Sequence, residues 1–360
     1  MEELRAQFPV LERVAYLNAG TNGPVPRRAF EATEAALIEQ LEQGRSNKAW
    51  FERMVERIDL LRERAAWLLG ASQADVALTG STTDGINSVL GAVDIAEGDE
   101  ILTSDEEHPG VLGPLATARD KRGATVRVVP FDELPDEVRP DTRIIVTSHV
   151  SWATGRVMDT APLAASGALV VLDGAQGLGA IPVDVRALGC DFYAASGQKW
   201  LCGPGGMGYL YANPELVADL PAPWSGYHAM QWSDQALVPA LHPDARRLST
   251  GYPAPHHVEW SHASLDVFEE AGFDEVHERA ADLAERFAGM LLERGIEVAP
   301  RGLSTLVSFE VPDPEAFAQR AADEGIVIRH LPGRPWARAS VGAWNTREEL
   351  ERLAELASRP

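Results

Sequence analysis

The sequence is poor in cysteine, in positive charge and in long apolar runs, and each shortage excludes a class of protein. With only two cysteines, Cys190 and Cys202, the chain cannot carry a disulfide framework, so a reducing compartment, the cytoplasm, is expected. No apolar stretch reaches the length of a membrane span. Residues 1–5 lack the basic region that opens a signal peptide, and no membrane partner is expected.

Acidic residues clearly outnumber basic ones. Asp and Glu total 54, Lys and Arg total 32, and the formal net charge is -22. A surface of this sign repels nucleic acid and anionic lipid, so neither is expected as a partner. An anionic cofactor would have to be held by local hydrogen-bond donors, because the field of the whole molecule repels it.

The remaining composition is that of an ordinary globular protein, with 45% hydrophobic and 24% charged residues. A length of 360 residues is enough to bury a large core. It also suggests two domains, or one large domain with an appendage.

Short apolar runs alternate with helical patterns through the first half of the chain. We expect helices at 28–43, at 50–69 and from 82 or 83, and strands at 76–79, 100–103, 125–129, 143–147 and 168–173. This alternation predicts an α/β fold, a doubly wound, mostly parallel sheet with helices on both faces. Ligands of such sheets bind beyond the carboxyl ends of the strands. The candidate site residues at these ends are Ser81, Thr83, His108, Asp173 and Gln176.

The pattern changes beyond about residue 243. We expect helices at 258–271, 274–294, 314–324 and 346–358, and strands at 303–311, 326–329 and 336–341. Thr346 and Glu349 form a capping-box signature at the last helix. These elements predict a smaller C-terminal α+β domain. The expected division is an N-terminal arm (1–15), a large domain (16–245) and a small domain (246–360).

Lys199 lies in a run of small and polar residues, 194–200, shortly after an apolar run that ends at Asp173. An enzyme that uses pyridoxal 5'-phosphate (PLP) needs an amine to hold the cofactor's aldehyde as a Schiff base. It also needs an anion to keep the pyridine nitrogen protonated. Lys199 and Asp173 are the candidates for these two roles. A lone pair of this kind is more often a surface lysine and a strand-end aspartate, so the prediction depends on the segments around it.

Two of those segments suit a phosphate group. The turn at 80–87 joins a predicted strand to a predicted helix, where free backbone N–H groups and the helix dipole bind anions. The hydroxyls of Thr82 and Thr83 would add donors, although a plain helix cap explains the same residues. Ser196 and Gln198 flank Lys199 closely enough to donate hydrogen bonds to the phosphate.

Two more residues suit the cofactor ring. His108 follows a predicted strand, and an imidazole can stack on a pyridine ring and move protons near neutral pH. Gln176 lies one turn beyond Asp173, within reach of the ring hydroxyl.

Taken in order along the chain, these motifs resemble the class V aminotransferase superfamily. The matching segments are 82–83, His108, 173–176, 196–199, 338–340 and 345–349. That superfamily includes cysteine desulfurases, kynureninase, isopenicillin N epimerase-like proteins and related carbon–sulfur lyases. The resemblance runs from residue 16 to the C-terminal helix. It implies the fold-type I PLP-dependent transferase fold and PLP as the cofactor.

The resemblance also implies a role for each matching residue. Lys199 would carry the Schiff base, Asp173 would pair with the pyridine nitrogen, and His108 would stack on the ring. Gln176 would contact the ring hydroxyl. The phosphate ligands implied are Thr82, Thr83, Ser196 and Gln198, with Gly251 and Tyr252 from the partner subunit of a homodimer. Arg338, helped by Arg329, would bind the substrate carboxylate through its forked guanidinium.

Several positions depart from the desulfurase pattern. The segment 330–337, where desulfurases carry a nucleophilic cysteine, has none, so no persulfide can form there. Trp152 stands where desulfurases tend to have Asn, and Gln198 where a His often precedes the lysine. The thiol of Cys202 is near the chemistry in sequence, but a buried structural role fits it better.

Trp336 and Trp344, near the expected carboxylate clamp, either contact an apolar part of the substrate or belong to the core.

From these motifs we expect an enzyme that acts on an amino acid through an external aldimine and a Cα carbanion. The favoured reaction is that of a carbon–sulfur lyase without a persulfide cysteine. Amino-group transfer to a keto acid is the first alternative and epimerisation the second. Turnover-free PLP binding fits a complete catalytic set less well.

Overall fold

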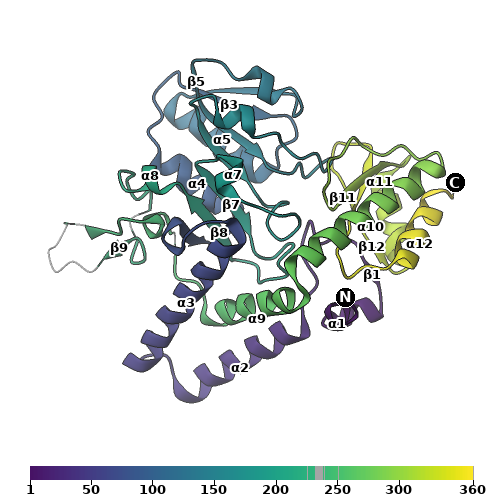
Figure 1. The fold of residues 1–360 in the computed structure, drawn as a ribbon, viewed down its shortest axis with the longest axis horizontal. Coiled ribbons are helices and arrows are strands. Elements are labelled where there is room, and N and C mark those ends of the chain that lie inside the picture. Colours follow the sequence, from purple (N-terminus) through teal and green to yellow (C-terminus); the bar gives the residue numbers. More distant parts are fainter. Residues whose placement is uncertain (225, 232–237, 239, 250, 360) are drawn as a thin grey trace.

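The computed structural model describes residues 1–224, 226–231, 238, 240–249 and 251–359. Its centre is a seven-stranded sheet of order β2-β8-β7-β6-β5-β3-β4 (Figure 1). The strands are Val76–Thr79 (β2), Glu100–Ser104 (β3), Thr125–Val129 (β4), Thr142–Ser148 (β5), Leu169–Asp173 (β6), Phe192–Ser196 (β7) and Gly208–Ala212 (β8). Only β8 runs antiparallel to its neighbours β2 and β7. The predicted mostly parallel α/β sheet is therefore confirmed.

Helices cover both faces of this sheet. Ile145 and Leu172 point into the core that holds side chains of α3 (Lys48–Leu69) and α9 (Pro255–Ala271). Ile144 and Val171 point to the opposite core, with α4 (Thr82–Ala92) and α5 (Pro109–Arg122). Because the central strands are buried on both faces, they read in the sequence as continuous apolar runs.

β7 and β8 were not among the predicted strands. β7 reads FYAAS and β8 reads GYLYA, so neither shows a continuous run of branched apolar residues. Their register is nevertheless important for the site. Asp173 at the end of β6 pairs with Ala194 of β7, and β7 ends at Ser196, three residues before Lys199.

A second, three-stranded antiparallel sheet forms in the C-terminal part, with order β11-β14-β13. Its strands are Leu306–Glu310 (β11), Arg329–His330 (β13) and Trp336–Ser340 (β14). Its core is shared with α10 (Phe273–Glu293), α11 (Pro314–Asp323) and α12 (Arg347–Ala357). The single strand predicted at 326–329 was wrong. It is two short strands, because β12 (Ile326–Val327) pairs with β1 (Ala15–Tyr16), whereas β13 pairs with β14.

The N-terminal segment joins this C-terminal unit. Ala15 and Leu17 lie in the same apolar core as Phe309, and α1 (Glu2–Ala6) precedes them. In the middle of the chain, α9 packs along α2 (Arg27–Gln43) and on the core of the large sheet. The domain boundaries at 15/16 and 245/246 remain predictions. The other short elements are α6 (Ala161–Ala164), α7 (Val185–Leu188), α8 (Pro214–Val217), β9 (Met230–Gln231) and β10 (Ala240–Leu241).

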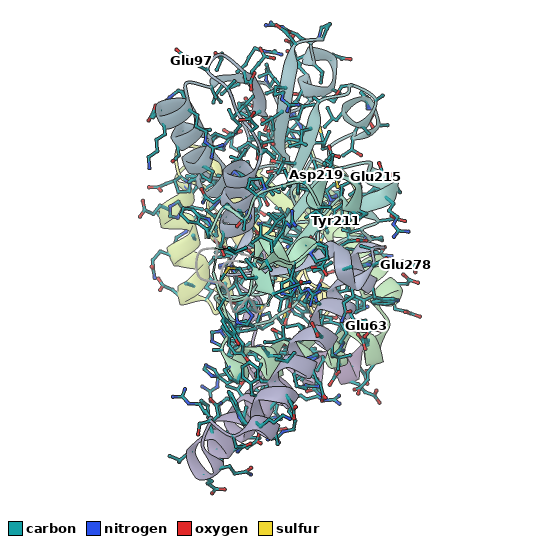
Figure 2. All side chains as sticks on the ribbon, turned by 90° about the vertical axis from the view of Figure 1, so that its left-hand side faces the viewer. Glu63, Glu97, Tyr211, Glu215, Asp219 and Glu278 are labelled. Carbon is teal, nitrogen blue, oxygen red and sulfur yellow. The ribbon has the colours of Figure 1, made fainter. Side chains whose placement is uncertain are left out.

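The acidic excess lies on the outside of the molecule. Figure 2 shows exposed carboxylates around the periphery, whereas Tyr211 of β8 lies inside. The labelled carboxylates are Glu63, Glu97, Glu215, Asp219 and Glu278. Within the part of the chain that the structure describes, no helix is both long and apolar enough to cross a membrane.

Candidate active site

Lys199 is set apart from the other lysines of the chain by its burial. The sequence has three, and Lys48 and Lys121 are exposed on helices, whereas Lys199 is partly buried at the carboxyl edge of the large sheet. Burial lowers the pKa of Lys199 to about 8; Asp173 opposes this shift, and Arg338 and Arg329 add to it. A free amine is thus available near neutral pH, as Schiff-base formation requires.

Asp173 is the last residue of β6 and is buried beside Lys199. Its Oδ1 accepts a hydrogen bond of 2.8 Å from the N–H of Ala175. Burial raises the pKa of Asp173, while the charge of Lys199 and the Ala175 bond lower it. A buried carboxylate of this kind is suited to a cationic partner such as a protonated pyridine nitrogen.

Several hydroxyl and N–H groups gather between the end of β2 and the start of α4. The N–H of Thr82 donates to Ser196 Oγ at 3.0 Å, and the Thr82 and Ser196 hydroxyls lie 2.6 Å apart. Thr83 faces the start of α5, since a Cβ placed on Gly110 would lie 2.3 Å from its hydroxyl. Gln198 Oε1 is buried without a hydrogen-bond partner among the described residues. Hydroxyl groups and a helix N-terminus thus lie together here, a combination that suits an anion.

His108 is the N-cap of α5. Its Nδ1 accepts a hydrogen bond of 3.0 Å from the N–H of Gly110, so the neutral ring carries its proton on Nε2. Burial, then the charges of Lys199, Arg329 and Arg338, lowers the pKa of His108 to about 4. The ring meets Trp152 edge-on at 5.2 Å. A neutral, fixed imidazole can stack on a ring but cannot itself hold a phosphate charge.

Arg338 is fully buried on β14 and reaches across to the large domain. Its Nη1 donates to the carbonyl oxygen of Trp152 at 2.6 Å, while its Nε and Nη2 are unpaired among the described residues. Arg329 lies over the Trp152 ring at 5.6 Å, and among the described residues its side chain makes two long hydrogen bonds, of 3.3 and 3.4 Å. Two guanidinium groups with open donors point to an anionic ligand, such as an amino-acid carboxylate.

Gln176 is engaged by the protein on both ends of its amide. Its Nε2 donates to the carbonyl oxygen of Gly20 at 2.8 Å, and its Oε1 accepts from Trp200 Nε1 at 2.9 Å. One Nε2 hydrogen is left for a ring hydroxyl. The geometry also ties the N-terminal loop at Gly20 to the site.

Four residues of this cluster were given no role from the sequence, although Ser340 lies in the matching segment 338–340. Gly20 approaches so closely that an added Cβ would lie 2.7 Å from Ser340 Oγ and 3.0 Å from Arg338 Nη2. The Ser340 hydroxyl is buried and unpaired among the described residues. Glu106 and Glu107 are buried carboxylates directly before His108. Acidic residues next to a candidate histidine were the one available signal.

The tryptophan alternatives separate in the structure. Trp344 lies in the core against Phe8 and Phe268, so the substrate-contact interpretation was wrong for it. Trp336 is half-buried under the guanidinium of Arg334 at 5.8 Å. Cys202 is 1% exposed, and burial raises its thiol pKa well above the ordinary range, which agrees with a structural role.

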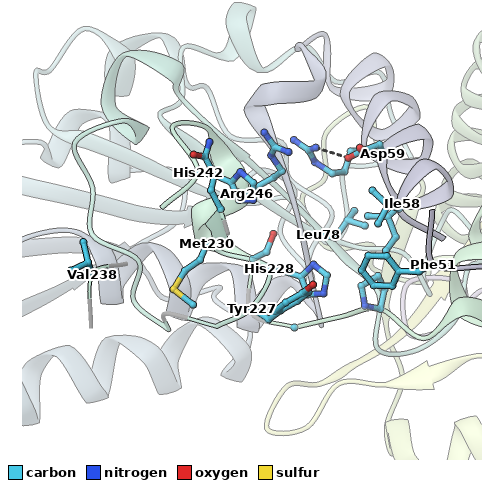
Figure 3. Close-up of a pocket in the computed structure, with 16 residues that line it drawn as sticks. Phe51, Ile58, Asp59, Leu78, Tyr227, His228, Met230, Val238, His242 and Arg246 are labelled. Atoms are coloured by element: carbon cyan, nitrogen blue, oxygen red, sulfur yellow. Dashed lines mark hydrogen bonds and ion pairs between the residues drawn. The ribbon is translucent and has the colours of Figure 1, made fainter. Parts of the chain in front are cut away.

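Gly251 lies away from this cluster, on a separate groove, and Tyr252 lines the smaller pocket that adjoins this groove. The groove has a volume of about 760 Å³, and it is open between α3 and the segments around 227–231 and 238–251 (Figure 3). Phe51 and Ile58 line one side of it, and the rings of His228 and Tyr252 contact each other at a tilt, with their centroids 4.4 Å apart. Neighbouring residues 232–237, 239 and 250 lie outside the described part of the chain.

Comparisons with known proteins agree with this geometry. A family model for class-V aminotransferases matches residues 15–353. A cysteine desulfurase of Klebsiella pneumoniae is 30% identical over 400 residues, covering 98% of this chain and 96% of the relative. The cystine C–S lyase C-DES, solved with its product cysteine persulfide, superposes with a TM-score of 0.91 at 26% identity, covering 98% of this chain and 99% of that chain.

The cysteine desulfurase CsdA from Escherichia coli superposes with a TM-score of 0.86 at 28% identity, covering 99% of this chain and 96% of that chain. Another C-DES structure, of a mutant with glycine covalently linked to the PLP cofactor, superposes with a TM-score of 0.92 at 26% identity, covering 98% of each chain. The donors collected around Lys199 fit that cofactor: a partly buried amine, a buried carboxylate and a hydroxyl-lined helix N-terminus. The chain therefore belongs to the class-V aminotransferase family and is a PLP-dependent enzyme that acts on an amino acid.

Proposed function

We propose that this enzyme is a carbon–sulfur lyase that cleaves S-substituted L-cysteines, cystine among them, by β-elimination. One observation carries the proposal. The hairpin from β13 to β14 is short, contains no cysteine and is tied to the large domain by Arg334, whose Nη2 donates to the Asp105 carbonyl oxygen at 2.9 Å. With Cys202 buried, no thiol is available to take sulfur from the substrate. The sulfur therefore leaves on a small molecule.

PLP, when bound, supplies an electron sink for a carbanion at the substrate Cα. We assign its linkage to Lys199, its pyridine nitrogen to Asp173 and its stacked face to His108. Its phosphate would be held by Thr82, Thr83, Ser196 and Gln198, with Gly251 and Tyr252 supplied by a partner subunit. Gln176 would orient the ring through its second amide hydrogen.

The protein's own groups handle the substrate. Arg338 binds the α-carboxylate through its two unpaired nitrogens. Arg329 is close enough to interact electrostatically with Arg338 and adds positive charge to the site. The Nζ of Lys199, with a pKa of about 8, takes the Cα proton. Trp152 forms the wall between His108 and Arg329, where it limits the width of the pocket and keeps water from one side.

The elimination balances without an oxidant or a reductant. The Cα–H bond breaks and its proton goes to Lys199 Nζ. The Cβ–S bond breaks with its electron pair leaving on sulfur, so cystine gives cysteine persulfide. Addition of water releases the remaining three carbons as a 2-keto acid and ammonia.

The active form in this proposal is a homodimer with shared active sites. Each subunit consists of the arm (1–15) and the two domains (16–245 and 246–360). The supporting feature is the open apolar groove that carries Gly251 and Tyr252. The two unpaired, buried thiols suit the cytoplasm.

The test is to add an S-substituted L-cysteine to the holoenzyme without a keto-acid acceptor and to follow the cofactor absorbance. Recovery of the original spectrum while 2-keto acid accumulates supports elimination. A cofactor stranded in its amine form means that the enzyme is an aminotransferase. Appearance of the D-isomer without keto acid means that it is an epimerase.

A further inference from the structure

Glu107 is a buried carboxylate to which the proposed mechanism gives no role. It is 4% exposed and lies where β3 ends, immediately before His108. Its Oε1 accepts hydrogen bonds from Ser104 Oγ at 2.6 Å, Thr147 Oγ1 at 2.9 Å and the Ser148 N–H at 2.9 Å. Its Oε2 accepts from Ser148 Oγ at 2.6 Å. Four donors directed at one carboxylate favour its ionised form.

The charge state of Glu107 is set by opposing effects. Burial raises its pKa to about 7, the hydrogen bonds from Ser104 and Ser148 lower it, and the charge of Asp173 raises it further. Above pH 7 this group is therefore a buried anion that interacts with Asp173.

Ser148 is hydrogen-bonded to Glu107 and is the neighbour of Asp173 in the sheet. It is the last residue of β5, and in the parallel pairing of β5 with β6 its partner is Asp173. Register partners on parallel strands point their side chains to the same face, on strands about 4.8 Å apart. Ser148 is thus held by Glu107 through both its N–H and its hydroxyl, and it lies beside Asp173. Glu107 and Asp173 are therefore both neighbours of the same residue, Ser148.

We propose that Glu107 is a positioning residue of the PLP site, which holds Ser148 at the end of β5 beside Asp173 and, as a second anion near Asp173, favours positive charge on the cofactor's ring nitrogen. This inference depends on the PLP cofactor and on the pairing of Asp173 with the ring nitrogen. It does not depend on whether the enzyme eliminates or transfers.

The neighbouring acid has a different task. Glu106 is 5% exposed and accepts hydrogen bonds from Ser151 and Thr154, and it lies 3.6 Å from the Arg156 guanidinium. These partners hold the 151–156 turn that presents Trp152. Glu106 and Glu107 therefore form a matched pair with the same turn and the same burial, but with different partners. The charged or titratable groups in the segments around them are Asp105, His108, His149, Arg156 and Asp173.

The experiment is an NMR titration of holoenzyme loaded with PLP that is labelled with ¹⁵N at the ring nitrogen, without substrate. In Glu107→Gln we expect the ring nitrogen to lose its proton about one pH unit lower than in wild type, which corresponds to a tenfold change in its proton affinity. In Glu106→Gln we expect the wild-type titration. With substrate, kcat falls on the order of tenfold for Glu107→Gln at nearly unchanged KM, whereas KM rises for Glu106→Gln.

A Glu107→Gln enzyme that is folded, binds PLP and titrates as wild type overturns the proposal and leaves Glu107 a purely structural group. If Glu107→Gln yields no folded holoenzyme, Ser148→Ala takes its place, because it removes a hydrogen bond that favours the ionised form of Glu107 and keeps both carboxylates. The same downward shift is then expected, and an unchanged titration overturns the proposal. Because no substrate is present, failure here is distinguishable from failure of the lyase assignment.

Discussion

Arg338 has no exposed surface, yet two of its nitrogens donate to nothing within the described residues. Burial and the neighbouring charge of Arg329 both lower the pKa of Arg338. Both effects disfavour its positive charge, but an arginine side chain stays protonated in proteins. Leaving buried donors unpaired is costly, and native proteins rarely do so without a reason. A substrate carboxylate is the group that would complete this site.

We predict that Arg338→Gln lowers kcat/KM roughly 100-fold, as expected for loss of charge-assisted hydrogen bonds to a carboxylate. Most of the loss should be in KM, since the carboxylate is bound in the ground state and the transition state alike. Steady-state kinetics with an S-substituted cysteine give the answer. The exposed Arg294→Gln is the control, and equal kinetics for the two variants would exclude a carboxylate-binding role.

We predict that reconstitution of the apoenzyme with PLP depends on the protonation of Lys199. The pKa of Lys199 is lowered to about 8, and only the free amine attacks the cofactor aldehyde. The second-order rate should therefore rise about tenfold per pH unit below pH 8 and level off above it. Stopped-flow absorbance measures this, and Lys199→Ala should give no Schiff-base signal. A rate that keeps rising to pH 10 would mean an ordinary, solvated lysine.

Residue roles could be predicted from the sequence where a motif carried them, and not where they depend on cross-strand neighbours. Asp173 and His108 follow strands, which is visible along the chain. Glu107 has meaning only through Ser148 and Thr147, which lie about forty positions away on β5. Gly20 and Ser340 meet only because the N-terminal loop crosses the small domain.

At the scale of elements, strand prediction succeeded for β2 to β6 because each contains a short run of apolar or β-branched residues, although the edge strand β4 is largely exposed. It failed for β7, β8 and the 326–329 segment. There the pairing partner decides the structure, since β12 and β13 are separated by a single residue and pair with different strands. The loop from β1 to α2 contacts β14 through the bridge between Asn18 and Ser340, a tertiary contact that no local pattern in the sequence reveals.

That loop has no room for a side chain at position 20. We predict that Gly20→Ala lowers kcat/KM at least tenfold, because its Cβ would displace the Ser340 hydroxyl or the Arg338 guanidinium. Global stability should change little, since flexible side chains can yield. Gly113→Ala is the control. It lies within α5 with open space around its Cα and should stabilise the protein by about 0.5–1 kcal/mol. Steady-state kinetics measure the loss of kcat/KM, and urea unfolding measures the stability of both variants. An unchanged kcat/KM for Gly20→Ala would contradict this geometry.

At the scale of the whole molecule, the large groove and the exposed apolar residues of the helix pair α2 and α3 lie on the same side. Phe30, Leu41 and Phe51 are 58%, 85% and 42% exposed. Of these, Phe51 lies beside Gly251 and Tyr252, and this apolar surface suits a second copy of the chain, whose site would borrow Gly251 and Tyr252.

Subunit mixing tests this arrangement. Lys199→Ala and Tyr252→Ala are each predicted to be nearly inactive. A 1:1 mixture, unfolded and refolded together, should regain about one quarter of the wild-type activity, since half of the dimers are hybrids with one complete site. Mixing without subunit exchange is the control. No recovery in proven hybrid dimers would mean that Tyr252 serves its own subunit.

The central claim, elimination of sulfur without an enzyme thiol, is tested most directly by counting product. Holoenzyme is incubated with excess L-cystine and no keto acid, and the pyruvate formed is measured per subunit over time. The account predicts many equivalents of pyruvate, with matching ammonia and persulfide, and the same yield from Cys202→Ala. Formation of one equivalent per subunit of a 2-keto acid that still carries its sulfur, in place of pyruvate and with the cofactor left in its amine form, would contradict it.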